Sequence, residues 1–331
     1  MIVITQLAMA IKRTVSVTFF VAICVIFIAA QTELQNNDAR RASSKTGVLL
    51  LAHGGKQNWN EEVKKIAAMV NQTYPVEVAF GMASKRNIQS AIDNLVQRNV
   101  TEIVAVPLFI SSHSSVITST EYLLGHRNAA PPELARFAKM DHGHGSNSHG
   151  SSSHGADHDA DKSFDPTTPV KSPVPIKMLG ALNSHPLVAE VLLTRALSIS
   201  SKPKNEVVII VAHGPVLDEE NARWLADLKV LAKRVDSESG FKRVEYLTVR
   251  DDAPEPIRSN ATAELRELVR RAADEKANVL IVPLLLSYGG IEEGIKKRLE
   301  GLSYKMSPQA LLPDERLATW VLQEVASSTN N

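Results

Sequence analysis

Residues 47–54 read GVLLLAHG, and residues 207–214 read VVIIVAHG. Further along the chain, IVAVPLFIS at residues 103–111 is matched by VLIVPLLLS at residues 279–287. In each copy an apolar run ends in His-Gly, helical sequence follows, and a second apolar run contains a proline and ends in serine. Two matches in the same order indicate a duplicated α/β domain, with a histidine at the same place in each copy.

The apolar runs are typical of parallel strands that are buried on both faces, and the segments between them carry apolar residues at helical spacing. Parallel neighbours need helical crossovers, so each copy is predicted to be a small parallel sheet flanked by helices. The predicted strands are 48–52, 76–80 and 103–110 in the first copy and 207–212, 244–249 and 279–286 in the second; the predicted helices are 60–70, 88–98, 219–235 and 261–273. Each copy then ends in a similar segment, 176–193 and 304–322, which indicates a short last strand, a loop and a closing helix.

The first copy is longer than the second because it carries an insertion. Pro107 and Met178 are 71 positions apart, whereas Pro283 and Met306 are 23 apart, a difference of 48 residues. We therefore expect domain 1 over residues 46–200, domain 2 over residues 201–331, and a disordered insertion at about 138–174. Most of this insertion is of low complexity and has too few apolar residues to offset the entropy of ordering it.

Histidines are concentrated in the insertion. Residues 141–161 read DHGHGSNSHGSSSHGADHDAD and hold five of the ten histidines in the chain, namely His142, His144, His149, His154 and His158. Imidazoles on a flexible tether suit nickel, cobalt, zinc or copper, but they impose no fixed geometry. The pattern predicts loose metal sites that act as a reservoir, and a solvated linker is the alternative interpretation.

The N-terminus resembles an export signal. Lys12 and Arg13 precede an uncharged run at 14–30, and a polar spacer follows at 31–45. The run is 17 residues long, at the short limit for crossing a bilayer, so residues 1–30 are either a cleaved signal peptide or an N-terminal anchor. Both alternatives predict an exported protein, periplasmic or extracellular, with membrane attachment only through this segment.

Composition excludes several other classes of function. The 37 basic residues nearly balance the 36 acidic residues, which gives no basic face for nucleic acid. The single cysteine, Cys24, lies in the N-terminal segment, so the domains offer no thiolate ligands or disulfides. Neither His-Gly loop has a GxGxxG or GxxxxGK[ST] phosphate-binding pattern, and no organic cofactor is expected. The duplication favours a monomer, because it can replace a dimer of single domains.

The two duplicated histidines, His53 and His213, fall at the carboxyl edge of a buried strand, where open α/β sheets bind ligands. The loop after the Pro-containing strand carries His113 in the first copy and Glu292 in the second. Because these two strands are expected to be neighbours, we expect His53 to pair with His113, and His213 with Glu292. Such pairs bind a divalent ion with open positions or accept protons near neutral pH. The alternatives are a surface histidine at 113 and a helix N-terminal acid at 292.

These motifs resemble the CbiX/SirB group, the sirohydrochlorin chelatases, which are relatives of ferrochelatase among the class II chelatases. The similarity rests on the duplicated strand with His-Gly, the VPLF and VPLL strands, and the residues Leu179, Gly180, His185, Pro186 and Leu187. It covers roughly residues 46–137 and 175–325. The resemblance implies chelatase-like, flavodoxin-like domains that insert Co²⁺, Fe²⁺ or Ni²⁺ into sirohydrochlorin or a related tetrapyrrole without ATP, with the metal ion as a substrate.

The resemblance also implies roles for particular residues. His53 and His213 match the family histidine that holds the metal or accepts pyrrole protons, and Glu292 matches a carboxylate in the later loop. His113 departs from the pattern, because it follows its proline by six residues and the family histidine follows by about eight. An exported carrier of metal or tetrapyrrole without turnover is the alternative function, since the family's substrate is made in the cytoplasm.

Overall fold

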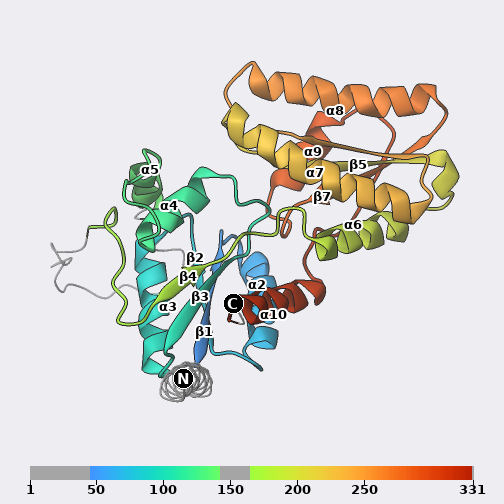
Figure 1. Cartoon of the computed structure of the whole chain (residues 1–331). Helices are drawn as coiled ribbons and strands as arrows, with labels where there is room; N and C mark the ends of the chain where they lie inside the picture. The colour runs from blue at the N-terminus through green and yellow to red at the C-terminus, as the bar shows by residue number, and fades with distance from the viewer. Residues whose placement is uncertain (1–44, 142–164, 330–331) are drawn as a thin grey trace, which may run out of the picture. The chain divides into compact units, whose positions relative to one another are not determined.

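The computed structural model describes residues 45–141 and 165–329, and two four-stranded parallel sheets organise them (Figure 1). The strand order is β2-β1-β3-β4 in the first sheet and β6-β5-β7-β8 in the second. The strands are β1 (Thr46–Ala52), β2 (Val76–Phe80), β3 (Glu102–Pro107), β4 (Ile176–Met178), β5 (Glu206–Ala212), β6 (Arg243–Thr248), β7 (Asn278–Leu284) and β8 (Lys305–Met306). This confirms the predicted fold class of a duplicated parallel α/β unit, and it confirms that the His-Gly strand lies beside the Pro-containing strand in each copy.

Helices connect the strands in the order that parallel pairing requires. They are α2 (Gln57–Val70), α3 (Lys85–Gln97), α4 (Ser115–Leu123), α5 (Leu134–Asp141), α6 (Pro186–Ile199), α7 (Asp218–Ser239), α8 (Ile257–Asp274), α9 (Ile291–Arg298) and α10 (Arg316–Thr329), with a 3₁₀ turn at Pro203–Asn205. Alternate residues of β1 point to opposite faces, so Val48 and Leu50 join one apolar cluster while Leu49 and Leu51 join another.

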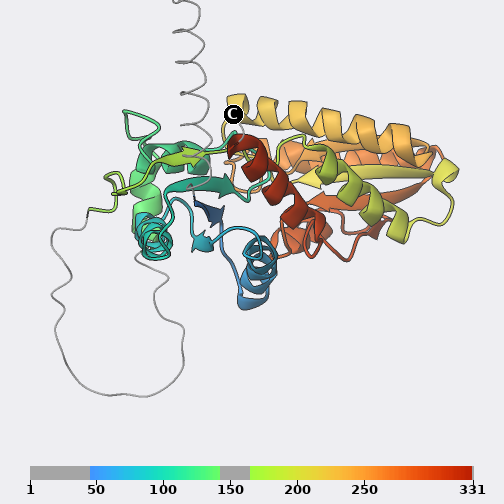
Figure 2. The same ribbon diagram turned by 60° about the horizontal axis from the view of Figure 1, so that its bottom comes forward.

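The closing helix of each repeat packs on the other repeat. Helix α6 follows the first sheet but packs against α7 and β7, whereas α10 follows the second sheet and packs against α2 and β3 (Figures 1 and 2). One apolar cluster therefore contains β1 and β5 residues together, including Val48 and Val208, along with Trp320 of α10. Each sheet completes its core with a helix from the opposite half.

Two side chains help to hold the exchanged segments, helix α6 and the segment before α10. His185 caps the start of α6, where its Nδ1 accepts a hydrogen bond from the backbone N–H of Leu187 at 3.2 Å. Arg195 is buried in the same helix and donates to the carbonyls of Ala310 (2.8 Å) and Leu311 (2.9 Å) in the segment before α10. It also lies 3.3 Å from the carboxylate of Asp314. The guanidinium therefore joins the two exchanged segments.

The structure corrects three expectations from the sequence. Strand β3 ends at Pro107 and not at residue 110, because 108–114 turns into the loop that precedes α4. Helices α4, α5 and α9 were not predicted, since Ser-rich, Gly-rich or short segments give little helical signal. Disorder over 138–174 is wrong at both ends, where residues 138–141 belong to α5 and residues 165–174 hold a defined path.

The segment at residues 165–174 is held by α3 and the adjacent core. The Gln89 side chain donates to the Lys171 carbonyl (2.8 Å) and accepts from its N–H (2.7 Å). Val170 and Val174 pack against the buried cluster around α3. These contacts supply the apolar burial that the composition of the insertion as a whole did not suggest.

Other predictions lie outside the described residues. These include the signal or anchor at 1–30, most of the spacer at 31–45, and the histidines at 142, 144, 149, 154 and 158. Within residues 45–141 and 165–329, none of the helices combines the length and the apolar character that crossing a bilayer requires.

Replacement of Arg195 tests the crossing. We expect Arg195→Met to lower the free energy of unfolding by about 3 kcal/mol. Removal of this buried, hydrogen-bonded charge leaves the carbonyl oxygens that it contacts without a donor. Urea denaturation provides the measurement. The control is Arg223→Ala in the exposed pair with Glu219, which should change the stability by less than about 1 kcal/mol. Equal effects of the two changes would contradict the role of Arg195.

Candidate active site

The two His-Gly turns have the same backbone geometry. Gly54 follows β1 with φ 79° and Gly214 follows β5 with φ 76°, a left-handed region that favours glycine. At Gly214 a Cβ would lie 2.5 Å from Cβ of Thr248 on the neighbouring strand. The glycine is therefore required by the turn and by the close strand, and it directs the preceding histidine out of the carboxyl edge of the sheet.

His53 and His213 lie within electrostatic reach of each other although they belong to different sheets. A positive charge on His53 disfavours the protonated form of the His213 imidazole and so helps to lower its pKa. Each half of the duplication therefore contributes one imidazole to the same region of charge.

His53 is exposed, and its ring orientation follows from one contact. Nδ1 lies 2.7 Å from the carbonyl oxygen of Gly54. A carbonyl only accepts hydrogen bonds, so Nδ1 carries the proton and Nε2 of the neutral ring keeps its lone pair. A histidine that binds a metal commonly has this arrangement, with one nitrogen donating to a carbonyl and the other free to coordinate.

His213 is less exposed, and burial lowers its pKa from the ordinary value of 6.5. The carboxylates of Asp252 and Asp251 oppose this shift, while His53 and Arg298 add to it. Nε2 of His213 lies 3.4 Å from Oδ2 of Asp252, at ion-pair distance but without hydrogen-bond geometry. The ring is therefore neutral at pH 7 and has a lone pair for a metal or a proton.

The carboxylates beside His213 were not identified from the sequence. Asp251 and Asp252 lie in the loop after β6, at the same edge as His213, and Asp251 forms an ion pair with Arg298 of α9. The Asp252 side chain is 72% exposed, so a ligand can reach it from solvent. The signal was available, because two acids shortly after a predicted strand mark this edge of the sheet. The corresponding loop of the first half, 81–84, reads GMAS and has no acid.

Arg250 fixes the loop that follows His213. Its backbone N–H donates to the His213 carbonyl at 2.7 Å, and its guanidinium donates to the carbonyls of Pro215 (3.1 Å) and Val216. It also pairs with Asp218 at 2.6 Å. Arg250 has φ 48°, a conformation that this network supports. No pattern in the sequence indicates this role.

Glu292 contacts the backbone of its own loop. Its Oε2 accepts hydrogen bonds from the backbone N–H groups of Gly290 (2.8 Å) and Gly289 (3.1 Å), at the start of α9. The helix N-terminal alternative describes this contact. The carboxylate that forms an ion pair with His213 is that of Asp252, and the pairing of Glu292 with His213 stays a prediction.

His113 also has a partner other than the predicted one. It lies half-buried before α4, and its charge acts on Asp227 of α7 in the second half. Its carbonyl accepts a hydrogen bond from Trp224 Nε1 at 2.7 Å. The loop after β3 therefore contacts the second half through His113, and the pairing of His113 with His53 stays a prediction.

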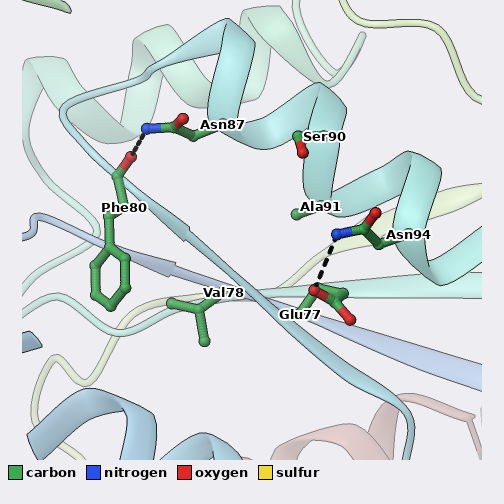
Figure 3. Close-up of a pocket in the computed structure, with 7 residues that line it drawn as sticks. All are labelled: Glu77, Val78, Phe80, Asn87, Ser90, Ala91 and Asn94. Carbon is green, nitrogen blue, oxygen red and sulfur yellow. Dashed lines mark hydrogen bonds between the residues drawn. The ribbon is translucent and has the colours of Figure 1, made fainter. Parts of the chain in front are cut away.

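The described residues contain no preformed group of three or more metal-ligating side chains. They do contain two shallow pockets at matching edge strands, each between the strand and the following helix. The pocket beside β2 has a volume of about 200 Å³ (Figure 3) and is lined by Glu77, Val78, Phe80, Asn87, Ser90, Ala91 and Asn94. The pocket beside β6 has about 220 Å³. Figure 3 shows that the side-chain amides of Asn87 and Asn94 on α3 donate hydrogen bonds to the Phe80 carbonyl and to the Glu77 carboxylate. These polar groups of the first pocket are therefore already engaged within the protein.

The electrostatics of His213 can be tested by NMR titration. We expect His213 to titrate below 6.5, and Asp252→Asn to lower the pKa further, because the substitution removes a carboxylate that favours the charged ring. Asp236→Asn, on an exposed position of α7, is the control and should leave the titration unchanged. A rise of the His213 pKa in Asp252→Asn would contradict the arrangement.

Residues 47–199 match the model of the CbiX family, so this part of the chain is similar to that family. A sirohydrochlorin cobaltochelatase from Methanothermobacter thermautotrophicus is 34% identical over 89 residues, which are 26% of this chain and 62% of that protein. The match thus spans less than two thirds of the relative.

Solved structures give the same result for the fold. SirB from Bacillus subtilis with Fe³⁺ has a TM-score of 0.56 at 16% identity, covering 86% of this chain and 96% of that chain. The sirohydrochlorin chelatase SirB from Bacillus subtilis subspecies spizizenii in complex with cobalt has a TM-score of 0.52 at 16% identity, covering 87% and 96%. At these identities the likeness concerns the fold, and it extends over both halves.

Proposed function

We propose that the chain inserts a divalent metal into sirohydrochlorin or a related tetrapyrrole, at the site where His53 and His213 meet. The observation that carries this proposal is the electrostatic coupling of the two repeated histidines, with Asp252 beside His213. The similarity to the CbiX family and to the named relatives suggests the substrate class. Cobalt is the metal to test first, with Fe²⁺ and Ni²⁺ as alternatives, because an open imidazole and carboxylate site does not discriminate strongly among them.

Insertion needs two kinds of group. The metal must lose its water ligands while it is held weakly, and the macrocycle must lose two pyrrole N–H protons. Neutral imidazoles at His53 and His213 can coordinate the ion through a lone pair or accept a proton. The exposed carboxylate of Asp252 adds an oxygen ligand and balances the charge. No nucleotide takes part in this scheme.

The proposal also assigns roles to two segments outside the described residues, and these roles rest on the sequence alone. The histidines at 142–158 would collect metal ions for the site, and residues 1–30 would direct the chain to the periplasm or the cell exterior. Catalysis there requires a tetrapyrrole outside the cytoplasm.

A carrier without turnover is the second candidate. It is favoured by the contacts of Glu292, whose carboxylate binds the backbone of its own loop and so does not serve as the base beside His213. A carrier would bind metal or tetrapyrrole stoichiometrically without accelerating insertion.

The decisive assay is the initial rate of Co²⁺ insertion into sirohydrochlorin, followed by absorbance. We expect a rate above the spontaneous one, and a loss of about 100-fold in His213→Ala, which is the contribution typical of a general base or positioned ligand. The chain without residues 142–161 should keep the rate at saturating Co²⁺.

His126→Ala is the matched control, because His126 is exposed in the turn after α4; it should behave like the unmodified chain. Bound metal or tetrapyrrole without any acceleration would reject the enzyme and support the carrier. An unchanged rate in His213→Ala would reject the assigned site.

A further inference from the structure

The first helix of each repeat carries a tryptophan and, three residues later, an acid. These are Trp59 and Glu62 on α2, and Trp224 and Asp227 on α7. Both tryptophans are buried, and the apolar residue after each acid, Val63 or Leu228, is in the core. Residues three apart lie on one face of a helix, so each tryptophan and acid can contact the same neighbour.

On α7 that neighbour is the β3 loop of the first half. Trp224 Nε1 donates to the carbonyl of His113 at 2.7 Å. Asp227 interacts with the charge of His113 and accepts a hydrogen bond from the hydroxyl of Ser184, which also belongs to the first half. Among the described groups, Oδ2 of Asp227 has no hydrogen-bond donor, so His113 is the charged group that compensates it.

On α2 the neighbour is the β7 loop of the second half. Ser287 donates its hydroxyl proton to Glu62 Oε2. Gly289 follows Pro283 by six positions, as His113 follows Pro107, and a Cβ on Gly289 would lie 3.5 Å from Cδ1 of Trp59. The contact lies at the corresponding place to the one on α7, with glycine in place of histidine and with packing on the tryptophan ring in place of the Nε1 hydrogen bond.

We propose that these two pairs are positioning residues that act crosswise. Trp224 and Asp227 hold the loop containing His113, and Trp59 and Glu62 hold the loop at 287–290 that leads into α9. Each half thus sets the position of a loop on the other half, and both loops flank the edges from which His53 and His213 project. This deepens the proposed function, on which its catalytic consequence rests.

The contact of α7 with the loop at 111–114 differs in one respect from the contact of α2 with the loop at 287–290. The contact at α7 includes the charges of His113 and Asp227, whereas the contact at α2 has an uncharged serine and a glycine. The loop at 111–114 is further held within its own half, where Ser112 N–H donates to Asn183 at 2.7 Å. Loss of the α7 contact should therefore loosen this loop without releasing it.

Hydrogen exchange by mass spectrometry on the full chain tests the crosswise pattern without any need for activity. Trp224→Phe removes the Nε1 donor. Exchange at 111–114 should become about fivefold faster, which corresponds to the net free energy of one hydrogen bond, and exchange at 287–290 should not change. Glu62→Ala should speed exchange at 287–290 and leave 111–114 unchanged.

The matched controls are Trp320→Phe, at the third tryptophan of the chain, and Glu61→Ala, at the exposed neighbour of Glu62. Neither should affect one loop selectively. Faster exchange in the loop of the substituted half, equal changes in both loops, or no change in either would overturn the proposal.

The insertion assay then separates positioning from binding. We expect Trp224→Phe to lower kcat about tenfold, because the loop that it holds follows β3, the strand next to the one that ends at His53, and small displacements near a reacting group are costly. The KM for Co²⁺ should stay within about twofold, because the residue supplies no ligand. Loosened exchange with unchanged kcat would overturn the catalytic part. If the unmodified chain shows no insertion, the proposed function fails and the exchange data still decide the crosswise contacts.

Discussion

The exchange of the closing helices is the constraint on which the rest of the structure depends. Neither sheet is covered by helices of its own half alone: α6 leaves the first sheet to pack on the second, and α10 returns from the second sheet to pack on the first. This joins the two halves in one apolar cluster. With the halves joined in this way, the histidines that follow β1 and β5 interact electrostatically.

Much of the fold could be predicted because it is encoded locally. Apolar runs such as 207–212 and helical periods such as 60–70 identify strands and helices, and the repeat makes each copy support the other. The exchange of α6 and α10 could not be predicted, because apolar periodicity shows that a helix is buried but does not identify the partner that buries it. Arg195, which joins both closing segments, shows no pattern in the sequence.

The site was predicted in part for the same reason. His53 and His213 were identified because the repeat marks them, and the sheet topology places both at carboxyl edges. Their meeting depends on how the halves are joined, which no local pattern records. Glu292 and Asp252 both follow strands at this edge, but the backbone N–H groups of Gly289 and Gly290 engage Glu292. Asp252 lies 3.4 Å from His213. Contacts with backbone N–H groups thus hold one acid in its own loop, while the other forms an ion pair with the histidine.

We propose that the duplicated histidines form one shared site. Equilibrium titration with Co²⁺ of the chain lacking residues 142–161 tests this proposal, with His53→Ala and His213→Ala in parallel. We expect one tightly bound ion per chain, lost in either variant. Two bound ions per chain, with each substitution removing only one of them, would contradict a shared site and show that each half holds its own.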